Sequence, residues 1–221
     1  MITEKIHIYF VPGLAAGKEI FKNIRLPEDR FEIHFLEWLL PQKEESLKQY
    51  AHRMAKKVTR PEAVLVGVSF GGVVAQEMNT YLNLKRLIII SSVKTRSELP
   101  KSFKLAGNLG AYKIVPTGWA LSIKDLTRLA IGPRSKKRLT LYQEYLSVRD
   151  KIYLDWAIKQ MVCWGRTEAI QGVIHLHGTA DIVFPVKNII DAVFLEGGTH
   201  VMILNKGGRV SKLLENIIEN R

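Results

Sequence analysis

Cysteine is almost missing from this sequence: Cys163 is the single one among 221 residues. One cysteine can form no disulfide within the chain, and it cannot supply the several thiolates that hold a structural zinc ion. The stability of the fold must therefore come from a packed apolar core, which a chain of this length is ample to build. Sparse cysteine is also typical of a reducing compartment, so we expect a cytoplasmic protein.

Long apolar segments and nucleotide-binding loops are also absent from the sequence. No apolar run approaches the roughly 20 residues that a membrane-spanning helix needs, so we expect no transmembrane segment. The first residues, Met-Ile-Thr-Glu-Lys, lack the basic and apolar regions of a secretory signal, which agrees with the expected cytoplasmic location. No G-x-G-x-x-G stands at a strand end and no Walker A loop is present, so we expect no nucleotide cofactor.

Acidic residues are scarce: 21 Asp and Glu stand against 33 Lys and Arg, which gives a net charge of +12. Most of the excess lies between residues 91 and 166, where fifteen basic residues stand against five acidic ones. The simplest interpretation is a set of solvated helix faces. Attraction of an anionic substrate and weak contact of this basic segment with an anionic membrane surface remain open as alternatives. We expect no nucleic-acid partner, because no nucleic-acid-binding motif is recognisable.

Apolar, β-branched segments alternate with segments of helical periodicity over most of the chain. This alternation is typical of an α/β fold whose parallel strands are connected by right-handed helical crossovers. We therefore predict one α/β domain, a mostly parallel six-stranded sheet flanked by helices. The expected strands are 5–11, 31–38, 63–68, 87–91, 172–176 and 192–195, and the expected helices of the core are 18–24, 46–58, 70–82 and 207–220.

Residues 92 to 166 break this alternation. They contain no convincing strand but show patches of helical periodicity at 119–130, 135–148 and 152–164. We interpret the segment as a helical insertion. The single domain of residues 1–221 would then consist of a core, 1–91 and 167–221, and this insertion.

The most informative stretch joins the third expected strand to the helix that follows it. Ser69 stands at the junction, in Gly67-Val68-Ser69-Phe70-Gly71, which is the G-x-S-x-G pattern of a nucleophile elbow. The small residues two before and two after the serine let strand and helix pass close together. The hydroxyl then stands at the carboxyl edge of the sheet, over the N-terminus of a helix. The pattern predicts that Ser69 is a nucleophile.

A serine hydroxyl is a poor nucleophile and needs a general base that a third group holds in place. Asp181 and His200 follow the last two expected strands, and parallel strands bring their carboxyl ends to one edge of the sheet. Structural roles remain open for both, because Asp181 could cap a helix near Val186 and His200 could lie on the surface. Glu196, just before the histidine loop, is a second candidate for the acid.

Together these motifs resemble the α/β-hydrolase superfamily, and its small serine esterases and lipases in particular. The resemblance rests on the Gly-Val-Ser-Phe-Gly-Gly elbow and on two loops that follow in the family order of serine, acid and histidine. These loops read His-Gly-Thr-Ala-Asp181-x-x-x-Pro and Gly-Gly-Thr-His200. The resemblance covers nearly the whole chain outside 92–166, and it implies that this insertion is a cap over the active site.

The resemblance implies a catalytic triad of Ser69, Asp181 and His200, with an oxyanion hole made by the backbone N–H groups of Leu14 and Phe70. Pro12 stands where the family commonly has histidine, a departure that a backbone donor at Leu14 tolerates. The implied reaction is hydrolysis of a small carboxylic ester or thioester through an acyl-enzyme, with no cofactor and no metal. Acyl transfer or peptide hydrolysis at the same site, and a ligand-binding protein without catalysis, are the alternatives.

Overall fold

The structure is a computed structural model that describes residues 4–110 and 147–219. Six strands form one sheet in the order β2-β1-β3-β4-β5-β6, and all neighbouring strands are parallel. This confirms the predicted sheet. The strands are β1 (Ile6–Val11), β2 (Phe31–Phe35), β3 (Ala63–Val68), β4 (Leu84–Ile90), β5 (Ile174–Gly178) and β6 (Val193–Leu195).

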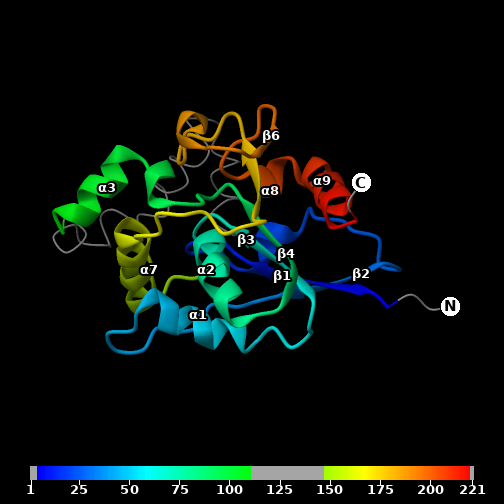
Figure 1. The fold of residues 1–221 in the computed structure, drawn as a ribbon, viewed down its shortest axis with the longest axis horizontal. Coiled ribbons are helices and arrows are strands. Elements are labelled where there is room, and N and C mark those ends of the chain that lie inside the picture. Colours follow the sequence, from blue (N-terminus) through cyan, green and yellow to red (C-terminus); the bar gives the residue numbers. More distant parts are fainter. Residues whose placement is uncertain (1–3, 111–146, 220–221) are drawn as a thin grey trace.

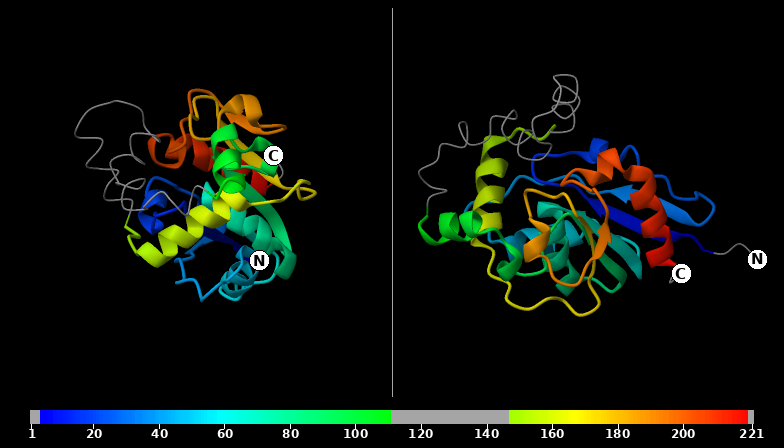
Figure 2. Two further views of the ribbon diagram at one scale, coloured as in Figure 1. Left: turned by 90° about the vertical axis from the view of Figure 1, so that its left-hand side faces the viewer. Right: turned by 90° about the horizontal axis from the view of Figure 1, so that it is seen from above.

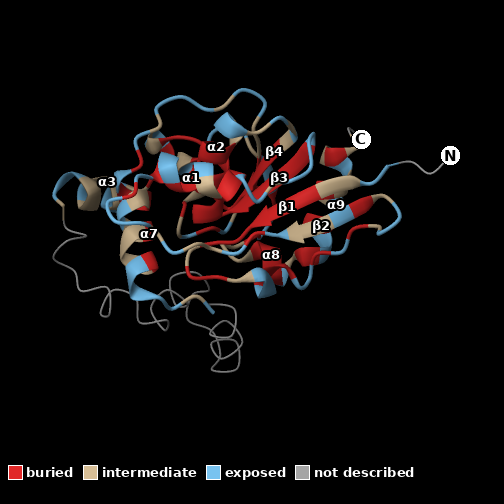
Figure 3. Cartoon of the chain, turned by 90° about the horizontal axis from the view of Figure 1, so that it is seen from below, coloured by how far each residue is buried: buried red, intermediate tan, exposed pale blue. Residues whose placement is uncertain are grey.

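Helices cover both faces of this sheet (Figures 1 and 3). One face packs against α1 (Leu47–Ala55) and α2 (Phe70–Met78), and the other packs against η1 (Lys18–Phe21), α8 (Met202–Asn205) and α9 (Gly207–Ile218). Successive side chains of a strand point to opposite faces, so β1 serves both layers. Its Tyr9 and Val11 belong to the core under α1 and α2, whereas Ile8 and Phe10 belong to the core under α9.

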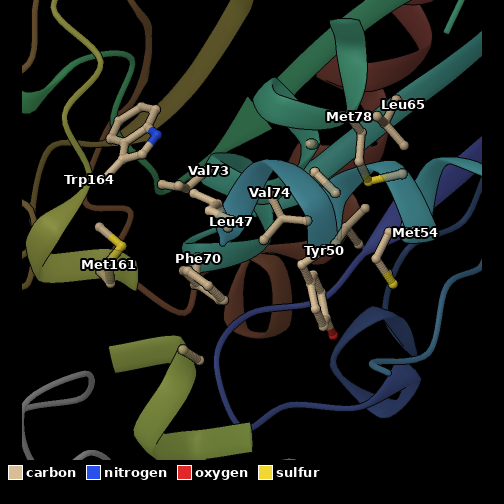
Figure 4. Packing of buried hydrophobic residues seen from close by; sticks show 14 of the residues in the cluster. Leu47, Tyr50, Met54, Leu65, Phe70, Val73, Val74, Met78, Met161 and Trp164 are labelled. Carbon is tan, nitrogen blue, oxygen red and sulfur yellow. The ribbon is translucent and has the colours of Figure 1, made fainter. Parts of the chain in front are cut away.

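The core under α1 and α2 holds α2, the helix that begins directly after Ser69, in place. Figure 4 shows Tyr50 and Met54 of α1, Val74 and Met78 of α2 and Leu65 of β3, which belong to one buried cluster. The helix α1 begins after Ser46 because the Ser46 side chain and the Gln49 side chain each accept a hydrogen bond from the other residue's backbone N–H. This capping box fixes the start of α1 beside α2.

Several element ends differ from the predictions. The strand β2 ends at Phe35 rather than at residue 38, and α2 ends at Met78 before a short 3-10 turn, η2 (Asn79–Tyr81). Two strands also extend beyond their predicted ranges, since β4 begins at Leu84 and β5 runs on through Gly178.

The chain between β4 and β5 contains η3 (Arg96–Glu98), α3 (Lys101–Asn108) and α7 (Lys151–Cys163) in its described part. The predicted helix 152–164 is therefore observed, and none of the described residues of this insertion forms a strand. The predicted helix 119–130, most of 135–148 and the basic cluster 134–138 lie outside the described residues. Figures 1 and 2 show α3 and α7 beyond the carboxyl ends of the strands.

The two ends of the insertion lie side by side. The Arg96 N–H donates to the carbonyl of Arg166 at 2.7 Å, and the Arg96 guanidinium donates to the carbonyl of Trp164 at 3.0 Å. The side chains of Trp164 and Arg166 both donate to the Glu77 carboxylate on α2. We call these bonds the stem of the insertion. Across the described ranges, no helix combines the length and the apolar character needed to cross a membrane.

Candidate active site

The turn from β3 to α2 is built around Ser69. This residue has φ 53° and ψ −120°, a conformation that costs a residue with a side chain roughly 1 to 3 kcal/mol. Its backbone is held from both sides, because its N–H donates to the Ile90 carbonyl at 2.9 Å and its carbonyl accepts from the Ser92 hydroxyl at 2.7 Å. The strain is therefore maintained by the neighbouring end of β4.

Two glycines allow the close approaches that this turn needs. A Cβ atom at Gly67 would lie 2.4 Å from the carbonyl oxygen of Gly71, so the strand and the helix could not pass at their present separation. A Cβ atom at Gly71 would lie 2.1 Å from the carbonyl oxygen of Pro12, in the loop after β1. The first glycine thus permits the elbow, and the second brings the loop after β1 against it.

Three polar side chains from separate loops meet at the carboxyl edge of the sheet. The Ser69 hydroxyl lies 2.9 Å from Nε2 of His200, and Nδ1 of His200 lies 2.9 Å from Oδ2 of Asp181. A carboxylate can only accept, so Nδ1 carries the imidazole proton and Nε2 is left to accept from the serine hydroxyl. The structure therefore brings together the three residues that the sequence motifs single out.

The Asp181 carboxylate is buried, and each of its two oxygens has a hydrogen-bond partner. Its Oδ1 accepts from the backbone N–H groups of Val183 at 2.8 Å and Phe184 at 3.0 Å, while its Oδ2 faces His200. Burial by itself would raise the pKa of Asp181, but the charge of His200 and the hydrogen bonds from His200 and Phe184 outweigh it and lower this pKa. The acid is therefore ionised at neutral pH, as a partner of an imidazolium must be.

Phe184 connects the acid to the histidine. Its ring meets the His200 ring edge to face at 5.3 Å, and its carbonyl accepts from Nε2 of His177 at 2.9 Å. Since Nε2 of His177 donates, its Nδ1 accepts from Nε2 of His175, 3.2 Å away. Burial lowers the pKa of both His175 and His177, which agrees with two neutral rings. His177 therefore holds the loop that carries Asp181 through its hydrogen bond to the Phe184 carbonyl.

The loop after β1 presents a second set of polar groups beside the serine. The Gly13 carbonyl accepts from the Ala16 N–H at 3.0 Å and from Nε1 of Trp38 at 3.2 Å. In a trans peptide the next N–H points away from the carbonyl, so these bonds fix the direction of the Leu14 N–H. Within the described residues, neither Leu14 nor Phe70 uses its N–H in a backbone hydrogen bond.

The structure places the two candidates for the acid differently. Glu196 is exposed, whereas Asp181 contacts His200. The short helix η5 (Val186–Asn188) has Pro185 as its N-cap, so the interpretation of Asp181 as its cap is wrong.

Two residues of the site carry little or no sequence signal as participants. Trp38 follows a strand and would be read as a packing residue, and its contact with the Gly13 carbonyl depends entirely on the tertiary fold. Ser92 offers a weak signal, since it follows the strand next to the elbow and is small enough to lie against Gly72.

Comparison with known proteins finds matches among solved structures. No protein-family model matches the sequence, and no curated protein matches it. An esterase from Exiguobacterium antarcticum superposes with a TM-score of 0.72 at 14% identity, over 98% of this chain and 92% of that one. A thermophilic esterase from Thermogutta terrifontis gives 0.71 at 15% identity, over 97% and 90%.

The neighbours carry more than one activity in their names. A bromoperoxidase from Bacillus anthracis superposes with a TM-score of 0.69 at 13% identity, over 99% of this chain and 93% of that one. Likenesses at such low identity establish a common architecture. They confirm the expected fold, and this chain has the fold of the α/β-hydrolase family.

Proposed function

We propose that this chain is a serine hydrolase that cleaves a carboxylic ester or thioester through an acyl-enzyme. The observation that carries the proposal is the unbroken hydrogen-bond series from Ser69 through His200 to the ionised Asp181. The esterases among the structural neighbours support hydrolysis of esters. A ligand-binding protein would have no need for a strained serine aligned with an imidazole.

In the proposed mechanism Ser69 Oγ attacks the carbonyl carbon, and its proton moves to Nε2 of His200. The imidazolium then hands this proton to the leaving alcohol or thiol as the carbon–oxygen or carbon–sulfur bond breaks, which leaves the acyl group on Ser69. Water next loses a proton to the same Nε2 as it attacks the ester. Return of the proton to Ser69 Oγ releases the acid and restores the site. Asp181 stabilises the imidazolium in both halves of the cycle.

The oxyanion of the tetrahedral intermediate needs donors that are in place before the reaction starts. The N–H groups of Leu14 and Phe70 supply them in this proposal, and each is worth roughly 3 to 4 kcal/mol in the transition state. The Phe70 N–H belongs to the first residue of α2, where a helix leaves its N–H groups without partners. The Leu14 N–H is directed by the bonds to the Gly13 carbonyl.

The insertion, residues 92–166, is proposed to cap the site. Two aromatic contacts support this role: Trp156 of α7 meets the Phe70 ring at 6.1 Å, and Phe103 of α3 meets the Phe184 ring at 6.0 Å. Both helices thus touch residues adjacent to the proposed triad. A cytoplasmic location, an anionic substrate and contact with a membrane surface stay predictions from composition.

A panel of p-nitrophenyl esters and acyl thioesters of graded chain length tests the proposal. We expect hydrolysis with a clear optimum of acyl length, because the acyl group must fit between the core and the insertion. Labelling of the protein by a fluorophosphonate should accompany it, since this reagent reports an activated serine independently of the acyl group. A folded protein that neither hydrolyses the panel nor takes the label would leave the ligand-binding alternative.

Replacing Trp38 by phenylalanine tests the oxyanion donor at Leu14. We expect kcat to fall about ten-fold, less than the roughly hundred-fold loss of a whole donor, because the Gly13 carbonyl keeps its bond from Ala16. The phenyl ring keeps the packing against Phe70, whose ring centre lies 5.7 Å from that of Trp38. KM should change little, since the loss falls on the transition state.

The matched control for this variant is Trp156→Phe. Its indole donates to the Glu45 carbonyl, and its ring belongs to the same aromatic group through Tyr50, but it does not contact Gly13. An equal fall of kcat in both variants would mean that loss of aromatic packing, rather than direction of the Leu14 N–H, causes the effect.

A further inference from the structure

A second group of polar side chains lies away from the carboxyl edge, on strands β1 and β2. His7 pairs with Glu32 across the two strands, and His34 stands two residues after Glu32. Because alternate residues of a strand share a face, all three side chains project from the same face of the sheet. Sequence alone predicts no metal site here, since His7 is far from Glu32 and His34 along the chain and only the pairing of β1 with β2 brings it beside them.

One candidate ligand atom from each of the three residues lies within 4.8 Å of the other two. Nδ1 of His7 lies 3.0 Å from Nε2 of His34, and the Glu32 carboxylate oxygens lie 3.8 Å from the first nitrogen and 3.5 Å from the second. A zinc ion with tetrahedral angles and bonds of 2.0 to 2.1 Å separates its ligands by about 3.4 Å. These separations, of which the two from Glu32 involve different carboxylate oxygens, bracket this value, so an ion could bind with small side-chain movements.

Neighbouring groups orient an imidazole ring of this group of residues. The Tyr9 ring stacks on the His34 ring at 4.4 Å and 17°, and its hydroxyl lies 3.2 Å from the Thr59 hydroxyl, which fixes the tyrosine. Such outer contacts hold a ligating imidazole in one orientation. Tyr9 and His34 also line a surface hollow of about 340 Å³, which gives the site access to solvent.

From this geometry we propose that His7, Glu32 and His34 bind a divalent transition-metal ion of the Zn²⁺ class. Two imidazoles and one carboxylate form a ligand set that zinc accepts, with a water molecule in the fourth position. Among the described residues, the strand β2 lies at the edge of the sheet and pairs only with β1. An ion held by ligands from both strands fastens this edge to the sheet. The site lies toward the N-terminal end of β1, away from Ser69, so it is separate from the proposed triad.

Titration calorimetry of the metal-free protein with ZnCl₂ at pH 7.5 tests the proposal. We expect one ion to bind per chain and to raise the melting temperature, because an ion that binds only the folded state stabilises it. Glu32→Gln, a change at a half-exposed position, should weaken binding at least about ten-fold. His34→Phe should abolish the rise in melting temperature while keeping a ring against Tyr9.

The matched control is His52→Phe, because the His52 ring also lies against a tyrosine ring, that of Tyr81, at 4.7 Å between ring centres. This variant should bind zinc as the wild type does. Zinc binding should also persist in Cys163→Ser and in His200→Ala, which remove the exposed thiol and the imidazole of the proposed triad. The proposal is overturned if the wild type binds no zinc, if Glu32→Gln and His34→Phe bind it unchanged, or if His200→Ala abolishes binding.

Discussion

Replacing Ser69 by alanine is expected to abolish fluorophosphonate labelling and to lower kcat for ester hydrolysis about a million-fold. Without Oγ no acyl-enzyme can form, and the remaining groups can only assist direct attack by water. His200 and Asp181 would keep their mutual contact at 2.9 Å, so the rest of the site stays assembled. The measurement is the initial rate on the best ester of the panel, with labelling followed on a gel.

A second substitution at this position separates loss of chemistry from loss of fold. Ser69→Gly removes the same hydroxyl but also relieves the backbone, because glycine adopts φ 53° without a steric penalty. We expect both variants to be inactive and the glycine variant to be more stable than the alanine variant by about 1 to 2 kcal/mol in urea unfolding. Residual labelling in either variant would place the reactive nucleophile at another residue.

Changing Asp181 to asparagine is expected to lower kcat about ten-thousand-fold while the fold is retained. The amide oxygen can still accept from Val183 and Phe184, so the turn of the acid loop survives. The amide NH₂ then faces Nδ1 of His200 and donates to it. The imidazole proton then lies on Nε2. A protonated Nε2 can no longer accept a hydrogen bond from the serine hydroxyl.

Glu196→Gln is the matched control for this prediction. It makes the same carboxylate-to-amide change at the exposed acid that stands just before the histidine loop. We expect its kcat to stay within about two-fold of the wild type, because this side chain is exposed and surface substitutions usually have small effects. A larger loss in Glu196→Gln than in Asp181→Asn would identify Glu196 as the working acid.

Much of the fold was accessible from the sequence because its elements have clear periodicity. The strand β3 and the start of α2 at Phe70 have the predicted limits, since an apolar run and a glycine-bounded turn mark them locally. The predicted end of β2, at residue 38, was wrong because of a tertiary contact. Trp38 continues the alternation of the strand, but it turns out of the sheet and donates to the Gly13 carbonyl.

The predicted end of β5, at residue 176, was wrong for a related reason. His177 and Gly178 were predicted to lie in the loop that leads to Asp181. In the structure they belong to the strand, and His177 is buried with a hydrogen bond to Phe184. Polar residues that bury only through specific partners cannot be told from loop residues by periodicity.

Motifs sufficed to select the candidate triad, but not the groups that hold it. Ser69, Asp181 and His200 each follow an expected strand, and the geometry of a parallel sheet brings such positions together. The supporting contacts of Ser92 and Phe184 depend on distances that no sequence pattern encodes. The catalytic roles of all three triad residues stay predictions until the variants are measured.

The stem of the insertion has a consequence for how such proteins diversify. Its Arg96 and Arg166 ends are bonded to each other, so the chain leaves and rejoins the core at nearly one point. The entropic cost of closing a loop rises only slowly with its length. Evolution can therefore lengthen, shorten or exchange the residues between these ends with little strain on the sheet. Descendants of one ancestor would then differ mainly in this segment and in the compounds they accept, while inheriting the same core.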